Sequence, residues 1–460
     1  MLNKKIGKKL IPIAAVSAII LGTVLSGFPQ SNLEVEARSD QQNQGRIKNV
    51  IFLIGDGMGP TYNTAYRYYK DDKSTPYMEK TAFDKYLVGM QETYPWDDQE
   101  NITDSAAAAT AMSSGIKTYN NAIAVDVNKQ EVETVLEKAK EKGKSTGLVS
   151  TSQVTHATPA SFGAHDESRH NYNDIADDYF DELINGEHKI DVILGGGTSY
   201  FERSDRNLAE EFQEDGFSYV TTKEQLLNDD NEQVVGLFAP VGLNYAIDRP
   251  EEQPSLAEMT ESALDRLSKD NDGFFLMVEG SEIDWAGHDN DIVGAMSEME
   301  DFEEAFEAAI EFAKNDKQTL VITTADHSTG GFAMGIAGEY RWDPTSLLAA
   351  ERTPDFMASE IANGGEVEEV LSEYINLELT QEEIQSVQEA TATNDVGQID
   401  NAIERIFDVR SGTGWTTGGH DGVDVNVYAY GPQANEFFGL HDNHEVGQKV
   451  IDILMNKRTR

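Results

Sequence analysis

Ser105 lies directly after Asp104 and directly before an alanine-rich run in the stretch 101–110. Residues 106–112 favour a helix, and Gly115 is a plausible end for it. Ser105 is therefore expected at a helix N-terminus, where free N–H groups and the positive end of the helix dipole bind anions. A serine hydroxyl in that place could attack a phosphoryl group, although an Asp-Ser pair before alanines is also an ordinary N-cap.

Three further segments combine carboxylates with histidines, which together can hold zinc. Asp284 and His288 are one turn apart if Asp284 opens a helix. Asp326 and His327 follow an apolar run. His420 lies beside Asp421 in a glycine-rich loop, just before another apolar run. The chain has no cysteine, so a thiolate site is excluded. Each histidine alone would more often be structural, but three such clusters beside predicted buried strands indicate a metal site.

Asp56 lies in the turn Gly55-Asp56-Gly57-Met58-Gly59, which follows the apolar run 50–54. Glycines let the backbone approach a ligand closely, and sites in open α/β sheets lie at the carboxyl ends of strands. The turn is therefore a candidate part of the same site. By itself, such a turn is weak evidence, since it would more often be an ordinary connection.

Apolar runs alternate with helical patterns along most of the chain, which predicts an α/β fold with a largely parallel central sheet flanked by helices. The expected strands are 50–54, 146–150, 190–194, 234–238, 274–278, 319–323 and 425–430, and the expected helices are 132–142, 174–184, 255–267 and 292–313.

Residues 332–412 break this alternation and are interpreted as a helical insertion before the last strands. Four helices are expected there, beginning at Thr353-Pro354, spanning 366–375, opening with the capping box Thr380-x-x-Glu383, and spanning 399–409. A subunit contact and a rim of the site are both possible roles for this segment.

Residues 1–37 are typical of a secretory signal, with four lysines before an apolar stretch and small residues ahead of Arg38. A retained anchor is the alternative, but the stretch is short for a membrane span. We expect a linker at 38–47, a catalytic domain at 48–460, secretion to the extracellular or periplasmic space, and no stable span after signal removal.

The formal charge is −46, and removing residues 1–37, which hold four lysines and two glutamates, leaves 80 acidic and 32 basic residues, or −48. Such a charge opposes binding to nucleic acids and anionic membranes. It also repels anionic substrates unless metals or arginines reverse the local field. The surface suits high salt, where self-repulsion is screened; an ordinary acidic secreted enzyme is the alternative.

Taken in order, these segments resemble the bacterial alkaline phosphatases. The resemblance covers roughly residue 48 to the C-terminus and is weakest in the helical insertion. The matching segments are Ile102-Thr-Asp104-Ser105-Ala-Ala-Ala-Ala-Thr110, Gly55-Asp56-Gly57-Met58-Gly59, Thr158-Pro159-Ala160, Ser168-Arg169, Val278-Glu279-Gly280, Asp284…His288, Thr324-Ala-Asp326-His327 and Thr417-Gly-Gly-His420.

The resemblance implies two zinc ions, one magnesium ion and a phosphoserine formed on Ser105. It also implies a homodimer and small phosphate monoesters as substrates. Arg169 would hold two phosphoryl oxygens with its planar guanidinium. The implied ligands are Asp284, His288 and His420 for the first zinc, Asp56, Asp326, His327 and the Ser105 oxygen for the second, and Asp56, Thr158 and Glu279 for magnesium.

His156 and Trp285 depart from one common version of the family pattern, in which Asp and Lys or His stand at these places. They are expected to tune the third ion and the hydration of phosphate. Related phosphodiesterases or sulfatase-like hydrolases, and a non-catalytic phosphate-binding protein, are the competing interpretations. Arg169, Thr158 and Glu279 favour monoesters, and the intact Asp104-Ser105 element argues against a pure binding protein.

Overall fold

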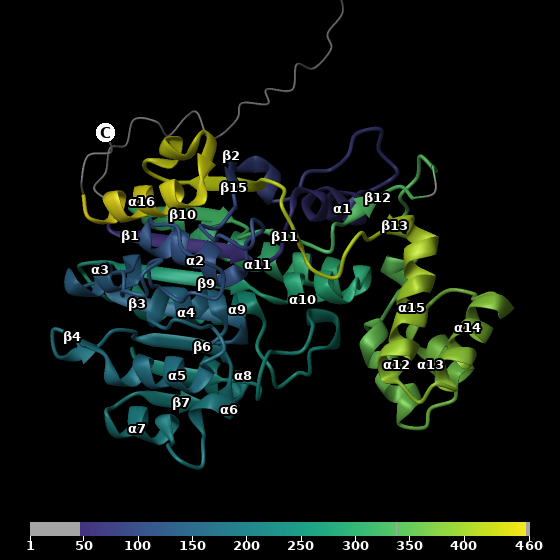
Figure 1. Ribbon diagram of the computed structural model, residues 1–460, viewed down its shortest axis with the longest axis horizontal. Coiled ribbons are helices and arrows are strands. Elements are labelled where there is room, and N and C mark those ends of the chain that lie inside the picture. Colours follow the sequence, from purple (N-terminus) through teal and green to yellow (C-terminus); the bar gives the residue numbers. More distant parts are fainter. Residues whose placement is uncertain (1–46, 337, 457–460) are drawn as a thin grey trace, which may run out of the picture. The chain divides into compact units, whose positions relative to one another are not determined.

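A ten-stranded sheet forms the centre of the computed structural model, which describes residues 47–336 and 338–456 (Figure 1). The expected signal segment 1–37 and nearly all of the linker lie outside these residues. The strand order is β16-β2-β15-β10-β1-β9-β3-β6-β8-β7. The strands are β1 (Asn49–Gly55), β2 (Leu87–Glu92), β3 (Ser145–Gln153), β6 (Val192–Gly196), β7 (Ser218–Val220), β8 (Val234–Leu237), β9 (Phe274–Gly280), β10 (Thr319–Thr324), β15 (Val425–Tyr430) and β16 (Gly439–Asp442).

Neighbouring strands in this sheet are parallel except where β15 is involved. β1 pairs in parallel with both β9 and β10, whereas β15 is antiparallel to β10 and to β2. The expectation of an α/β fold with a largely parallel sheet is confirmed. The sequence patterns missed β2, β7 and β16.

β1 is central because both of its faces are buried. Ile51 and Leu53 belong to one hydrophobic core, whereas Val50, Phe52 and Ile54 belong to the other. Burial on two faces explains why this strand is a continuous apolar run and not an alternating one.

Helices cover both faces of the sheet. The first core contains side chains of α1 (Pro60–Lys70), α8 (Lys223–Asn228), α9 (Leu256–Leu267), α10 (Glu282–Asp289) and α11 (Ile292–Asp316). The second contains side chains of α2 (Ser105–Ser114), α3 (Val135–Glu141), α4 (Ala157–Gly163), α5 (Tyr172–Asp181), α6 (Thr198–Phe201), α7 (Leu208–Glu214) and α16 (Asn443–Leu454). In the described part of the chain, no helix combines the length and the apolar character that a bilayer crossing requires.

The helix expected at 174–184 ends earlier, at Asp181. Leu183 and Ile184 pair instead with Glu187 and His188. The connection between these short strands is Asn185-Gly186, whose residues have φ of 56° and 87°. An Asn-Gly pair with positive φ is typical of a tight hairpin, so it ends the helical pattern here.

The four helices expected within 332–412 are present (Figure 1). They are α12 (Pro354–Ala362), α13 (Val367–Tyr374), α14 (Gln381–Thr391) and α15 (Val396–Ser411). Thr353 caps α12, and the capping box of Thr380 and Glu383 opens α14. Short strands β12 (Ala333–Met334) and β13 (Thr413–Gly414) pair at the two ends of this segment. We retain 332–412 as its proposed extent.

Candidate active site

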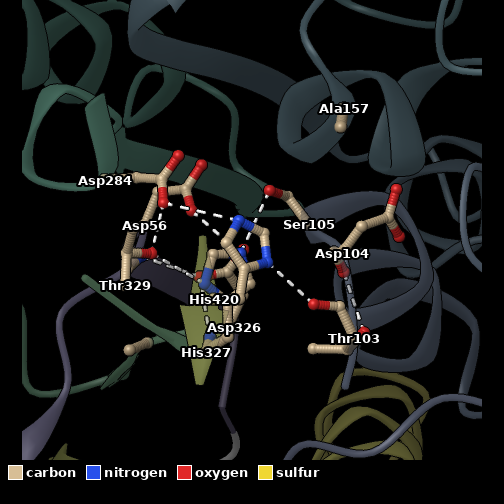
Figure 2. Close-up of polar contacts among 12 residues, drawn as sticks. Asp56, Thr103, Asp104, Ser105, Ala157, Asp284, Asp326, His327, Thr329 and His420 are labelled. Atoms are coloured by element: carbon tan, nitrogen blue, oxygen red, sulfur yellow. Dashed lines mark hydrogen bonds and ion pairs between the residues drawn. The ribbon is translucent and has the colours of Figure 1, made fainter. Parts of the chain in front are cut away.

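Ser105 begins helix α2, as the sequence predicts. Asp104 is the N-cap, and its side chain accepts a hydrogen bond from the backbone N–H of Ala107; Gly115 ends the helix with φ 76°. The Ser105 side chain is buried, and its Oγ lies 3.2 Å from Nε2 of His327 (Figure 2). The hydroxyl therefore lies at a helix N-terminus and in contact with one of the expected metal ligands.

The residues expected to hold the first zinc come together. α10 begins at Glu282, so Asp284 and His288 lie one turn apart, with Oδ2 and Nε2 separated by 3.3 Å. Nε2 of His420 lies 3.2 Å from Nε2 of His288 and 3.7 Å from Oδ1 of Asp284. Three donor atoms from two distant segments thus point at one another.

The second expected set is fully buried at the ends of β1 and β10. Nε2 of His327 lies 3.4 Å from Oδ1 of Asp56 and 3.2 Å from Oδ2 of Asp326. The ring of His327 also stacks on His420 with centroids 3.5 Å apart, which places the two expected zinc sets side by side.

The third expected set surrounds the end of β9. Asp56, Glu279 and His156 each offer a donor atom within 4.8 Å of the others, and Thr158 is completely buried. The structure therefore places His156 beside the donors that the sequence assigned here. Nδ1 of His156 and Oε1 of Glu279 are buried without a hydrogen-bond partner in the part of the chain that the structure describes.

The surroundings of Asp56, Asp326 and Glu279 destabilise the charged forms of these three carboxylates. Burial, followed by repulsion from Asp326 and Asp284, raises the pKa of Asp56 well above its usual range. Burial is also the main cause that raises the pKa of Asp326 to about 6 and that of Glu279 to about 7. Burial lowers the pKa of His327, which keeps its imidazole neutral and able to donate a lone pair.

These observations fit bound cations. Both oxygens of Asp56 and Oδ2 of Asp326 are buried, and within residues 47–336 and 338–456 they have no hydrogen-bond donor. Unpaired buried carboxylates are costly unless a cation compensates them. Imidazole nitrogens mixed with carboxylate oxygens suit zinc, and the set richer in oxygen also suits magnesium.

Arg169 is held at the edge of this group by two partners. Its Nη1 donates to Oδ2 of Asp104 at 3.1 Å, and its Nη2 lies 3.0 Å from Nε2 of His156. Burial lowers the pKa of His156 to about 3, so its neutral ring accepts from the guanidinium. Trp285 packs edge-on against the His156 ring, with centroids 5.8 Å apart. His156 thus contacts both the third set and the arginine.

The sequence did not indicate the groups that orient the histidines. Nδ1 of His420 lies 2.8 Å from the carbonyl of Thr103, and Nδ1 of His288 lies 2.8 Å from that of Gly418. These contacts favour a proton on Nδ1 and leave Nε2 free as a ligand. Backbone carbonyls carry no side-chain signature, so no sequence pattern could have found them.

Thr329 is a further residue that the sequence analysis missed. Its hydroxyl donates to Oδ1 of Asp284 and lies 3.3 Å from Nδ1 of His327 (Figure 2). Gly57 leaves room for this contact: it has φ +70°, and a Cβ there would lie 2.7 Å from Oγ1 of Thr329. The available signal was the position of Thr329 two residues after His327, on the short strand β11 (Ser328–Thr329).

Comparison with known proteins agrees with this geometry. The family model described as alkaline phosphatase matches residues 47–456. Alkaline phosphatase 3 of Bacillus subtilis is 61% identical over 98% of this chain and 98% of its own length. The structure is similar to that of a cold-active alkaline phosphatase from a psychrophilic Shewanella, with 42% identity, a TM-score of 0.84 and coverage of 88% and 99% of the two chains.

A variant of TAB5 alkaline phosphatase, from an Antarctic bacterium, is also similar, with 30% identity, a TM-score of 0.65 and coverage of 89% and 98%. In that variant a histidine is replaced by glutamate, and magnesium is bound in the site named M3. The sequence, the fold and the clustered ligands lead to one assignment: this chain belongs to the alkaline phosphatase family.

Proposed function

We propose that this protein is a metal-dependent phosphomonoesterase that acts through a phosphoserine on Ser105. The observation that carries the proposal is the position of the Ser105 hydroxyl, which lies at the N-terminus of α2 and 3.2 Å from His327 within the group of expected ligands. Helix N–H groups, Arg169 and bound cations would all favour a phosphoryl group at this place.

Two zinc ions and one magnesium ion are the proposed cofactors. The residues that would hold them are Asp284, His288 and His420 for the first zinc, Asp56, Asp326 and His327 for the second, and Asp56, Thr158 and Glu279 for magnesium. When bound, such ions supply Lewis-acid chemistry, which stabilises charge on the reacting oxygens.

Side chains of this protein have separate roles in the proposed reaction. Oγ of Ser105 loses its proton and attacks phosphorus, a new P–O bond forms, and the bond to the leaving group breaks; the leaving oxygen gains a proton and departs as the alcohol. Arg169 orients the phosphoryl oxygens, and Asp104 and His156 hold its guanidinium in place. A water then attacks the same phosphorus, which releases inorganic phosphate and restores the serine hydroxyl.

Three wider statements belong to the same proposal. Export to the extracellular or periplasmic space is supported by the pattern of residues 1–37, homodimerisation by family membership, and tolerance of high salt by the formal charge of −46. Nucleic acids are not proposed as partners.

Hydrolysis of a chromogenic phosphomonoester, with acid-quench trapping of the phosphoserine, tests the proposal. Ser105→Ala should fold, retain phosphate binding and lose nearly all turnover. Ser114→Ala is the matched control, since Ser114 lies on the same helix and donates only to the Thr110 carbonyl. Substantial turnover by the Ser105→Ala variant would assign the first attack to a different nucleophile.

A further inference from the structure

Three carboxylates gather where the helical insertion meets the helix that carries Asp284 and His288. Asp289 is the last residue of α10, and Asp400 and Glu404 lie one turn apart on α15. Each offers an oxygen, and these oxygens all lie within 4.8 Å of one another. None of the three residues belongs to the phosphatase site described above.

Two of these carboxylates are buried, and one oxygen of each has no partner among the described residues. Asp400 and Glu404 are only 4% and 5% exposed. Oδ1 of Asp400 and Oε1 of Glu404 have no hydrogen-bond partner among the described residues. Buried charges in native proteins are normally paired or bound to a metal, so these two oxygens lack the compensation that their burial requires.

The surroundings add negative charge. Burial, followed by repulsion from neighbouring carboxylates, raises the pKa of Asp400 to about 8 and that of Glu404 to about 10. Asp291 is one of those neighbours, and its own Oδ2 is also buried with no partner in the described part of the chain. A bound divalent cation would remove this repulsion and would let the carboxylates stay ionised at neutral pH.

We propose that Asp289, Asp400 and Glu404 form a binding site for a hard divalent cation, calcium, that joins α15 to the end of α10. The three side chains offer only oxygen, which calcium prefers and which distinguishes the group from the histidine-containing sets. Ligands about 2.3–2.6 Å from a calcium ion lie at most about 5 Å apart, which agrees with the observed separation. Asp289 is exposed, so the ion can arrive from solvent and keep water ligands on that side.

The position of the site gives it a structural role. Asp289 directly follows His288, and α10 also carries Asp284, so the ion would fix the end of the helix that positions two proposed zinc ligands. α15 packs against α12 and α14. Calcium would therefore attach the helical insertion to the catalytic part of the chain by three charged contacts.

The test uses the full-length protein loaded with zinc and magnesium. Calcium uptake is measured by equilibrium dialysis for the wild type, for Asp400→Asn with Glu404→Gln, and for a control variant, Glu368→Gln with Glu382→Gln. The control removes two charges from exposed residues of α13 and α14 in the same helical segment. We expect the wild type and the control to bind one more calcium per chain than the Asp400/Glu404 variant does.

Thermal melting gives an independent measurement. Calcium should raise the melting temperature of the wild type and the control by several degrees and leave the Asp400/Glu404 variant nearly unchanged, since only a folded-state site shifts stability. Without calcium the variant should melt at or above the wild-type temperature, because its amide side chains are neutral and need not take up protons in order to be buried. Equal calcium uptake by all three proteins, or an equal shift in melting temperature, would overturn the proposal.

Asp400→Asn alone provides a milder perturbation if the double variant folds poorly. This single variant should bind calcium more weakly than the wild type while it remains folded without calcium. Unchanged calcium affinity in Asp400→Asn would also overturn the site.

Discussion

Replacing Asp104 by alanine tests whether one carboxylate positions both the nucleophile and the arginine. Oδ1 of Asp104 accepts from the N–H of Ala107 at 2.9 Å, and Oδ2 accepts from the N–H of Asn121 at 3.0 Å and from Arg169 at 3.1 Å. Loss of a helix cap costs about 1 kcal/mol. Loss of a hydrogen bond with a charged group costs about 1.5–3 kcal/mol. Asp104→Ala should therefore reduce the free energy of unfolding by roughly 2–4 kcal/mol.

The same substitution should impair catalysis through Arg169, which would keep His156 as its one side-chain hydrogen-bond partner among the described residues. We expect kcat/KM to fall at least about tenfold, which corresponds to about 1.4 kcal/mol of transition-state stabilisation. Phosphate should also inhibit more weakly, because the guanidinium is no longer held for bidentate binding. Steady-state kinetics and product inhibition measure both effects, and urea unfolding with saturating metals measures stability.

A double-mutant cycle decides whether Asp104 acts through the arginine. Asp104→Ala, Arg169→Ala and the combined variant should be non-additive in kcat/KM, because the second substitution removes a group that the first has already displaced. Asp104→Asn is the control for the helix cap, since its amide oxygen can still accept from Ala107. Additive losses, or unchanged phosphate inhibition in Asp104→Ala, would refute the reasoning.

Four further predictions concern metals, charge and pH. Chelation should abolish turnover, with zinc restoring most of it and magnesium adding more; full activity in a protein shown by elemental analysis to lack zinc would contradict this. The melting temperature should rise with sodium chloride concentration, because the Debye length falls from about 10 Å at 0.1 M to about 3 Å at 1 M. A melting temperature that stays flat or falls would argue against charge repulsion as the factor that limits the stability of the fold. His156→Asp with Trp285→Lys should strengthen magnesium dependence and lower the inhibition constant for phosphate. The reason is that the two substitutions add an anion beside the third set and a cation near phosphate. If neither constant changes, the role of both residues is limited to packing. Burial lowers the pKa of His165, but the hydrogen bond with Glu137 outweighs burial and raises that pKa above 6.5. The destabilisation caused by His165→Gln should therefore be largest below about pH 6.5 and shrink as pH rises. Urea unfolding at several pH values measures this change.

The central strands could be predicted because burial on both faces leaves a clear pattern. The runs at 50–54, 274–278 and 319–323 became β1, β9 and β10 with changes of one or two residues at their ends. β2 was missed because its residues are mostly exposed or half-buried and show no apolar run. Its place in the sheet depends on pairing with β15 and β16, which lie more than 300 residues later and are invisible to a local pattern.

The side chains of the site could be predicted because the ends of parallel strands meet at one edge of the sheet. Their supporting contacts could not, because they depend on three-dimensional proximity. Arg169 and Asp104 are 65 residues apart, and no spacing rule indicates that they pair. The Asp289–Asp400–Glu404 group was also missed, since two of its members lie on a helix of the insertion and resemble ordinary surface acids in the sequence.

The order in which the chain is synthesised gives the position of His420 a further consequence. His420 contacts the Thr103 carbonyl from 317 residues away, and β1 lies between two strands that begin at Phe274 and Thr319. Contacts so distant in sequence form late and slow folding. A nascent chain therefore cannot assemble the complete set of histidines until almost all of it has been made, so capture of the full metal set must follow synthesis. If the chain is exported, the metals that the enzyme acquires are therefore determined by the compartment in which folding finishes. The compartment that contains the ribosome does not determine them.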